Sequence, residues 1–401
     1  MHRANPMGLD ETHDPPGADD GRKPIPHRAR SNVRGLFCAI LCGVACGCGD
    51  GGGGSSSSGN PPPPPTSATL LAVTNATTGT IDILTIDAKT GTPTPIAGDP
   101  LPDGPTPSAV AIDPQKRFLY VTSTSGEVRG YLVDPSTLTL TAVTGSPFST
   151  SAQSVAIAVD PSGQFVLTAN GGANTVSVFK IGSTGALTEV AGSPFAAGAD
   201  PSALVVAAGK YVYAANTAGR SVSAYSMDTT SGALTPVAGS PFPTGGSPNG
   251  LVVDQADTHV YATESQPNEL SGFTINASTG ALTAIPGSPF AASYAIRSPV
   301  MDAEGQRLHV ANGTDVDCFL VDANSALTEI GLSDTNGRAI ALALDGPDNF
   351  LYALDNIDNQ IEVFSIDPTD GSLTLITGSP FALFPGASSQ DLGPNAITVQ
   401  H

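Results

Sequence analysis

The chain has 401 residues, of which 45 are Gly and 35 are Pro; it contains no Trp, and only 13% of its residues are charged. This composition is typical of short strands joined by many turns, and it argues against a helical enzyme. The formal net charge of −20 opposes binding to nucleic-acid phosphates and to anionic lipid surfaces. We therefore expect no nucleic-acid partner.

Residues 1–48 have the features of an export segment. Arg28, Arg30 and Arg34 precede an apolar run at 35–45, which is too short to span a bilayer. Residues 44–48 follow it and read Val-Ala-Cys-Gly-Cys. This stretch resembles a bacterial lipoprotein signal, in which the Cys after the cleavage point carries the lipid. The resemblance implies lipidation at Cys48, with Cys46 as the alternative.

Residues 49–67 form a Gly/Ser run followed by five consecutive Pro residues and a short polar end. Such a segment cannot bury apolar surface and is typical of an extended tether. Its position after the Cys cluster supports the lipid anchor. We therefore expect an exported protein held at the bacterial cell envelope, in the periplasm or at the outer surface, which contacts the membrane only through its lipid.

From residue 68 to residue 401 the chain repeats itself. The motif Gly-Ser-Pro-Phe begins at residues 145, 192, 239, 287 and 378, so successive steps are 47, 47, 48 and 91 residues. The long step covers two units, with Gly331 as the degenerate marker, and one step before the first motif lies Gly98. Seven units of this length predict a seven-bladed β-propeller.

The third repeat shows the strands of one unit. Apolar or alternating runs occur at 155–159, 165–169, 175–179 and 186–190, and turn residues separate them. No run is long enough for a periodic helix. The sequence therefore predicts an all-β domain with four antiparallel strands in each blade.

The first repeat begins at a second strand, residues 70–74, and no inner strand precedes it. The missing strand is found at the other end of the chain, where residues 394–399 match the opening of an inner strand. We therefore expect the C-terminus to pair into blade one. This pairing removes the sheet edges that an open array would expose, so we expect a monomer.

Several short motifs recur within the repeats. In the third repeat they are the turn Asp-Pro-Ser-Gly at 160–163, Val-Ser-Val-Phe at 176–179 and Thr-Gly-Ala-Leu-Thr at 184–188. These motifs resemble the lactonase-type seven-bladed propellers, which include the propeller 6-phosphogluconolactonases, a muconate-lactonising enzyme and YVTN-repeat proteins. The resemblance covers residues 68–401 and implies the same fold.

The predicted second strands end in equivalent polar positions. They are Asn75, Ser123, Asn170, Asn216, Glu264, Asn312 and Asp355. Asn and Asp favour such positions because their side chains bond nearby backbone in turns. Glu264 has no such preference and is the only Glu of the set.

The family resemblance implies that a Glu in this position works with a His in a Pro-x-His context at the start of the same blade. Here the segment reads Pro-Asn-Gly, so Gly250 takes the place of the His. The resemblance also implies Arg residues that hold an anionic substrate. Arg220, Arg297 and Arg338 lie in loops expected on the same face, although none matches a family motif strictly.

Other polar residues have simpler interpretations. His259 and His309 lie in predicted second strands and are not spaced as a ligand set, so we predict no metal site. Residues 355–359 contain two Asp and two Asn but lack the Gly and the spacing of a calcium loop. No phosphate loop and no Gly-x-Ser-x-Gly motif occurs, and we predict no cofactor.

Two functions remain open. The first is a non-catalytic binding or scaffold propeller, whose partner is a small molecule or an envelope protein. The alternative is a lactone hydrolase, similar to 6-phosphogluconolactonase, or a lactonising enzyme that uses Glu264. The missing His favours the first, whereas the resemblance and Glu264 favour the second.

Overall fold

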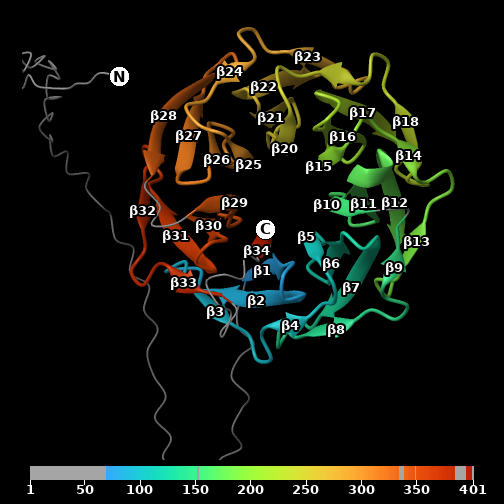
Figure 1. The fold of residues 1–401 in the computed structure, drawn as a ribbon, viewed down its shortest axis with the longest axis vertical. Helices are drawn as coiled ribbons and strands as arrows, with labels where there is room; N and C mark the ends of the chain where they lie inside the picture. Colours follow the sequence, from blue (N-terminus) through green and yellow to red (C-terminus); the bar gives the residue numbers. More distant parts are fainter. Residues whose placement is uncertain (1–68, 151–152, 334–337, 348, 384–393, 400–401) are drawn as a thin grey trace, which may run out of the picture. The chain divides into compact units, whose positions relative to one another are not determined.

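The computed structural model describes residues 69–150, 153–333, 338–347, 349–383 and 394–399. They form seven antiparallel sheets arranged as blades around a central channel (Figure 1). The predicted signal segment, Cys46 and Cys48 as the predicted lipidation positions, and the predicted tether lie outside the described residues. Within the described ranges, no helix is long and apolar enough to cross a membrane.

Each blade runs outward from the channel in chain order. Blade one consists of β1 (Thr69–Asn75), β2 (Thr80–Ile86), β3 (Pro93–Pro95), β4 (Leu101–Pro102) and the C-terminal β34 (Pro394–Val399). Blade two consists of β5 (Pro107–Ile112), β6 (Phe118–Ser123), β7 (Glu127–Val133), β8 (Leu140–Ala142) and β9 (Phe148–Ser149). Blade three consists of β10 (Ser154–Val159), β11 (Phe165–Asn170), β12 (Thr175–Ile181), β13 (Leu187–Glu189) and β14 (Phe195–Ala196), with a short 3-10 turn at Gly171–Ala173.

The remaining blades follow the same plan. Blade four consists of β15 (Pro201–Ala207), β16 (Tyr211–Asn216), β17 (Ser221–Met227), β18 (Leu234–Pro236) and β19 (Phe242–Pro243). Blade five consists of β20 (Pro248–Val253), β21 (His259–Ser265), β22 (Asn268–Ile275), β23 (Leu282–Ala284) and β24 (Phe290–Ala291). Blade six consists of β25 (Arg297–Met301), β26 (Arg307–Ala311), β27 (Val316–Val321) and β28 (Leu327–Ser333). Blade seven consists of β29 (Ala339–Leu344), β30 (Phe350–Asp355), β31 (Gln360–Ile366), β32 (Leu373–Leu375) and β33 (Phe381–Ala382).

The C-terminal strand closes the ring, as the sequence predicts. β34 pairs antiparallel with β1, with Leu71 opposite Val399 and Val73 opposite Ile397. It therefore serves as the inner strand of blade one and lies beside the channel with the inner strands of the other blades (Figure 1). The prediction of seven four-stranded blades closed by the C-terminus is confirmed.

The Gly-Ser-Pro-Phe motif bends the chain between the short fourth strand and the return to the channel. Its Ser hydroxyl accepts a hydrogen bond from a backbone N–H of the third strand, as Ser240 Oγ does from Ala224 at 2.9 Å. Its Phe then pairs with the start of that same strand, as Phe242 does with Val222. Blade six lacks this turn: Gly331 lies inside the continuous strand β28, so it marks the period without forming the turn.

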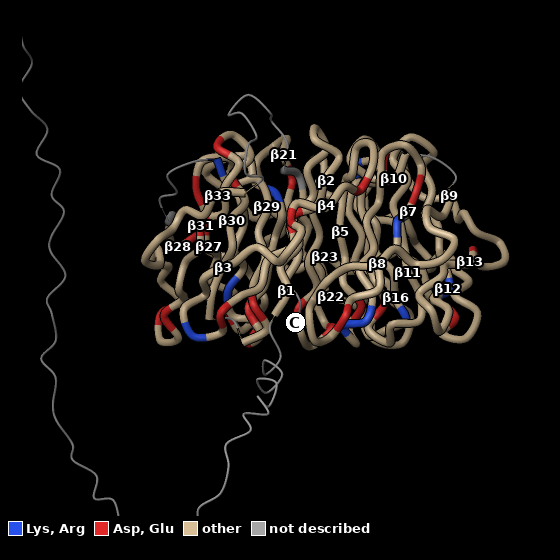
Figure 2. Tube along the Cα trace, turned by 90° about the horizontal axis from the view of Figure 1, so that it is seen from below, with Lys and Arg blue, Asp and Glu red and all other residues tan. Residues whose placement is uncertain are grey.

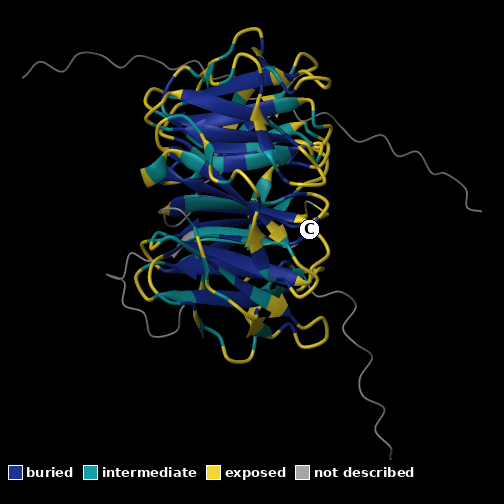
Figure 3. Ribbon diagram, turned by 90° about the vertical axis from the view of Figure 1, so that its right-hand side faces the viewer, coloured by how far each residue is buried: buried dark blue, intermediate teal, exposed yellow. Residues whose placement is uncertain are grey.

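Most of the core lies between neighbouring blades, and the strands are buried while the loops at both ends are exposed (Figure 3). A buried Tyr in the second strand fastens one blade to the next. Tyr213 donates its hydroxyl to the Gly280 carbonyl at 2.9 Å, and Tyr120, Tyr261 and Tyr352 make equivalent bonds. In blade six the equivalent residue is His309.

Candidate functional site

The polar residues that end the second strands gather at one end of the propeller, because each second strand ends beside the start of its own first and third strands. All seven are buried. Several of them accept backbone hydrogen bonds from the following turn; Asn75 Oδ1, for example, accepts from the N–H groups of Thr77 and Thr78. Asp355 Oδ1 likewise accepts from the N–H groups of Ile357 and Asp358. The turn interpretation is confirmed for Asn75, Asn312 and Asp355, whereas Asn170 and Asn216 bond Ser and Thr side chains of the third strand.

Glu264 behaves differently from the rest of this ring. It is 0% exposed, and neither oxygen of its carboxyl group makes a well-formed hydrogen bond. Burial raises the pKa of Glu264 to about 7; the nearby Ser271 hydroxyl lowers it in part, and the charge of Glu269 raises it further. A group with this pKa can exchange a proton near neutral pH.

Gly250 lies on the inner strand β20, where the family resemblance would place a His. It is opposite Thr263 in the strand register, one residue before Glu264. A Cβ at this position would lie 2.5 Å from Cδ of Pro299 in the next blade and 2.7 Å from Oγ1 of Thr263. The absence of the His is therefore built into the packing between blades five and six, which leaves no room for a larger side chain.

Arg220 lies in the loop between β16 and β17, at the same end of the propeller as Glu264. Its Nη2 donates to the Gly245 carbonyl at 2.9 Å. Gly246, the next residue, covers Glu264 closely, because a Cβ there would lie 2.7 Å from Glu264 Oε2. The structure thus brings Arg220 next to the segment that covers Glu264, while its guanidinium bonds to that segment.

Arg297 and Arg338 form a second group of positive charge at this end. Arg297 begins β25, and Arg338 directly precedes β29. Burial lowers the pKa of Arg297, and the nearby charge of Arg338 lowers it further. Its buried Nε has no hydrogen-bond partner. Basic residues are sparse on the propeller (Figure 2), so two neighbouring guanidinium groups offer an evident place for an anion.

The start of blade six lies beside the start of blade five. Nδ2 of Asn249, next to Gly250, donates to the Ile296 carbonyl at 2.9 Å, and Arg297 follows directly. The three predicted arginines therefore lie at the same end of the propeller as Glu264. Their roles in binding, and that of Glu264 in catalysis, remain predictions.

The sequence reading missed Glu269. It lies directly opposite Glu264 across the β21–β22 hairpin. The signal was present in the sequence, because a hairpin with two loop residues, Gln266 and Pro267, fixes this pairing. Glu269 could be assigned as the partner of Glu264 only once the ends of both strands, and hence the register of the hairpin, were known.

The histidines have structural positions. His259 Nδ1 lies 2.9 Å from Asp254 Oδ2, and burial of Asp254 is outweighed by hydrogen bonds from His259 and Thr258, which lower the pKa of Asp254 to about 2. His309 is 0% exposed, and burial and the charge of Arg307 lower its pKa to about 4. Across the described ranges, no three His, Cys, Asp or Glu residues are grouped to hold a metal ion.

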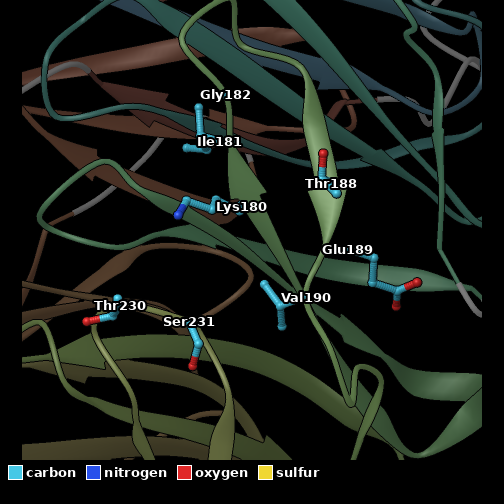
Figure 4. Close-up of a pocket in the computed structure, with 8 residues that line it drawn as sticks. All are labelled: Lys180, Ile181, Gly182, Thr188, Glu189, Val190, Thr230 and Ser231. Atoms are coloured by element: carbon cyan, nitrogen blue, oxygen red, sulfur yellow. The ribbon is translucent and has the colours of Figure 1, made fainter.

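A cavity of about 390 Å³ lies away from this site, on the outer wall between blades three and four, where Lys180 and Glu189 face Thr230 and Ser231 of the next blade (Figure 4). This cavity is lined by neither Glu264 nor any of the three predicted arginines, and no buried titratable group lines it. We therefore place the candidate site at the end of the propeller that carries Glu264 and the arginines.

Comparison with known proteins agrees with this architecture. The family model described as lactonase, 7-bladed beta-propeller, matches residues 68–193 and 188–295. No curated protein matches the sequence. Among solved structures, a 6-phosphogluconolactonase candidate from Bacteroides uniformis is 18% identical with a TM-score of 0.72, covering 83% of this chain and 100% of that one.

Two further structures have the same fold. A 6-phosphogluconolactonase candidate from Bacteroides fragilis is 18% identical with a TM-score of 0.72, covering 84% of this chain and 99% of that one. The periplasmic gluconolactonase of Pseudomonas aeruginosa is 19% identical with a TM-score of 0.67, covering 79% of this chain and 99% of that one. At such identities the likeness shows the fold, and the family model carries the assignment. The chain belongs to the lactonase family of seven-bladed β-propellers.

Proposed function

We propose that this protein is a binding propeller that holds a small anionic ligand at the Glu264 end of the channel and hydrolyses lactones poorly or not at all. The observation that carries the proposal is Gly250. Pro299 of the neighbouring blade occupies the space that a catalytic His would need. A lactonase-type site without this second proton-transfer group has lost a typical factor of about 10²–10⁴ in rate.

The arginines give the ligand its chemistry. The charge of Arg338 lies close enough to Arg297 to lower the pKa of Arg297, and no described carboxylate forms an ion pair with either residue. Two adjacent guanidinium groups favour a carboxylate or phosphate, which they can bind through paired hydrogen bonds. Sugar acids and their phosphates therefore fit this end of the propeller.

The binding test uses isothermal titration calorimetry of the full chain with gluconate and 6-phosphogluconate. We expect Arg297→Gln to weaken binding at least tenfold. Arg117→Gln is the matched control, because Arg117 pairs with Asp113 at the other end of the blades. Equal losses in both variants, or no binding by the wild type, would remove the proposal.

A lactone hydrolase remains the second candidate, and the pKa of Glu264 favours it. A carboxyl group that titrates at about 7 can act as a general base on water. Opening of gluconolactone and 6-phosphogluconolactone by the wild type, Glu264→Gln and the exposed control Glu304→Gln should be compared with the spontaneous rate. Wild-type catalysis far above that rate, lost only in Glu264→Gln, would establish the second candidate.

We also propose that the protein is exported as a monomer and anchored at the cell envelope through a lipid on Cys48. The support is the sequence alone: the basic and apolar segment, the cysteines and the Gly/Ser/Pro tether. Cys48→Ala should abolish a diacylglyceryl mass on the exported chain without unfolding the propeller. If the variant keeps that mass, Cys46 is the lipidated residue.

A further inference from the structure

Glu264 faces another carboxyl group across its hairpin. In the antiparallel register Glu264 is directly opposite Glu269, so both side chains leave the same face of the sheet. In five other blades the two residues at the equivalent positions are not both acidic. The pairs are Asn75 with Thr80, Ser123 with Glu127, Asn170 with Thr175, Asn216 with Ser221, and Asp355 with Gln360.

Three of these pairs are joined by a hydrogen bond from a side-chain amide donor: Asn170 with Thr175, Asn216 with Ser221, and Gln360 with Asp355. Asn170 donates through Nδ2 to Thr175 Oγ1 at 3.1 Å, and Gln360 donates through Nε2 to Asp355 Oδ2 at 3.1 Å. Two ionised Glu residues cannot bond in this way, since neither has a donor. Blade five therefore replaces a donor–acceptor pair by two acceptors unless one of them carries a proton.

Both carboxyl groups end beneath the same short backbone segment. A Cβ at Gly245 would collide with Glu269 Oε1, and one at Gly246 would lie 2.7 Å from Glu264 Oε2. Two hydrogen bonds hold this segment in place. Gly245 donates its N–H to Ser271 Oγ at 3.1 Å, and the Gly245 carbonyl accepts from Arg220. The two carboxyl groups are therefore held close to each other under a cover without side chains.

No described cation forms an ion pair with either carboxyl group. Arg220 contacts the segment that covers the two carboxyl groups, but its guanidinium donates to the Gly245 carbonyl and not to a carboxyl group. A buried carboxylate that has no counter-charge and no well-formed hydrogen bond is unfavourable, and a second carboxylate beside it adds repulsion. Holding one proton relieves both effects, which agrees with the raised pKa of Glu264.

We propose that Glu264 and Glu269 are a proton-sharing carboxyl pair, in which the fully buried Glu264 holds the proton. The pair takes up one proton from solvent as the pH falls through neutrality. It places one exchangeable proton at a site where the packing of Gly250 leaves no room for a His. Glu269 acts on Glu264 and is thus a positioning residue.

The pair also links ligand binding to protons, an extension that rests on the proposed function. When both groups are ionised, two negative charges oppose an anion bound at this end of the propeller. The shared proton removes one of them, so the proposed anionic ligand binds more favourably to the protonated pair. Binding of an anion near neutral pH should therefore draw a proton from the buffer.

The pair itself is tested by urea unfolding of the full chain between pH 4 and pH 9, which needs no ligand. The folded pKa of Glu264, about 7, lies above its ordinary value of 4.5. Its contribution to stability is therefore present below pH 4.5 and is lost as the pH rises through 7. We expect Glu264→Gln to raise the folding equilibrium constant by roughly 10- to 100-fold at pH 8, and to change it little at pH 4.

Glu269→Gln is the decisive variant. It keeps Glu264 and removes only the neighbouring charge, so the stability loss should move to lower pH. The exposed control Glu304→Gln should leave the wild-type profile unchanged. A Glu269→Gln profile that coincides with the wild-type profile would show that the two groups do not share a proton and would overturn the proposal.

Proton uptake is tested separately, by calorimetry with inorganic sulfate, an anion that does not itself titrate near pH 7, in buffers of different ionisation enthalpy at pH 7. We expect net proton uptake by the wild type and none in Glu264→Gln. Binding without uptake would overturn the link between the pair and the ligand. Absence of sulfate binding would count against the link and the anion site, whereas the unfolding profiles decide on the pair independently.

Discussion

Blades four and five have the same strand order and pairing but use the end of the second strand differently. In blade four, Asn216 donates through Nδ2 to Ser221 Oγ at 3.1 Å and to Ser223 Oγ at 3.0 Å. In blade five, the equivalent residue is Glu264, which makes no well-formed hydrogen bond and faces Glu269. The first arrangement fastens a hairpin, whereas the second leaves a buried group that can exchange a proton.

The inner strands of the two blades differ in a related way. Ala203 of blade four occupies the register position that Gly250 occupies in blade five. The methyl group fits in blade four, but in blade five Pro299 lies where a Cβ would be. The difference shows that a repeat can keep its strand pairing while single replacements change the packing and the titration of a buried position. Four predictions test this view.

The largest effect is expected from opening the ring on which both blades depend. Deletion of residues 394–401 removes β34 and leaves β1 with an unpaired inner edge. We expect loss of cooperative thermal unfolding, or aggregation, because the exposed edge can pair with other chains. Deletion of residues 400–401 alone, beyond β34, is the control. A melting temperature unchanged by the longer deletion would contradict closure by the C-terminus.

The second prediction compares Gly250→Ala with Ala203→Gly. The added methyl in blade five would contact Pro299 and should cost about 1–3 kcal/mol of unfolding free energy. Ala203→Gly should cost only about 0.5–1 kcal/mol, as glycine in a strand does. Urea denaturation measures both values. A neutral Gly250→Ala would mean that Pro299 yields easily, and a His at position 250 would then have to be considered again.

The third prediction transplants the pair of blade four into blade five. The double variant Glu264→Asn with Glu269→Ser replaces two acceptors by a donor–acceptor pair. We expect a gain of about 2 kcal/mol at pH 8, because burial no longer opposes ionisation of a carboxyl group there. The gain should disappear near pH 4. A gain that is the same at both pH values would show that packing, and not the proton, causes it.

The smallest effect is expected for Asn216→Ala, which removes the fastening in blade four. Loss of the bonds to Ser221 and Ser223 should cost about 1 kcal/mol. This cost should not vary between pH 5 and pH 8, since none of the three side chains titrates in that range. A pH-dependent cost would show that the ring of polar residues is electrostatically coupled between blades, and the contrast with blade five would weaken.

The fold could be predicted from the sequence because each blade repeats the same turn residues. Asp160, for example, accepts hydrogen bonds from the N–H groups of Gln164 and Phe165, which explains an Asp at that turn. Gly331 is the exception, because it was assigned as a repeat marker from the repeat length alone and not from a Gly-Ser-Pro-Phe motif. Inside β28 it meets no such requirement, and the turn expected from its position in the repeat does not form.

The site was less predictable, because its chemistry depends on contacts between elements. Glu264 stood out as a residue type that its position does not favour. Glu269 became visible only when the strand register was known. The contact between Gly250 and Pro299 joins two blades, and no pattern within one repeat reports it. Burial, which sets the pKa of Glu264, likewise depends on the segment that folds over it.

Closure by β34 has a consequence for the order of events during synthesis. The edge of β1 is made among the first strands, but the strand that covers it comes from the last residues of the chain. At typical translation rates, on the order of tens of seconds separate the two. During this interval the nascent chain carries an open edge that its own later blades cannot cover. A chain released early would keep that edge, so premature termination should produce a species prone to aggregation or degradation.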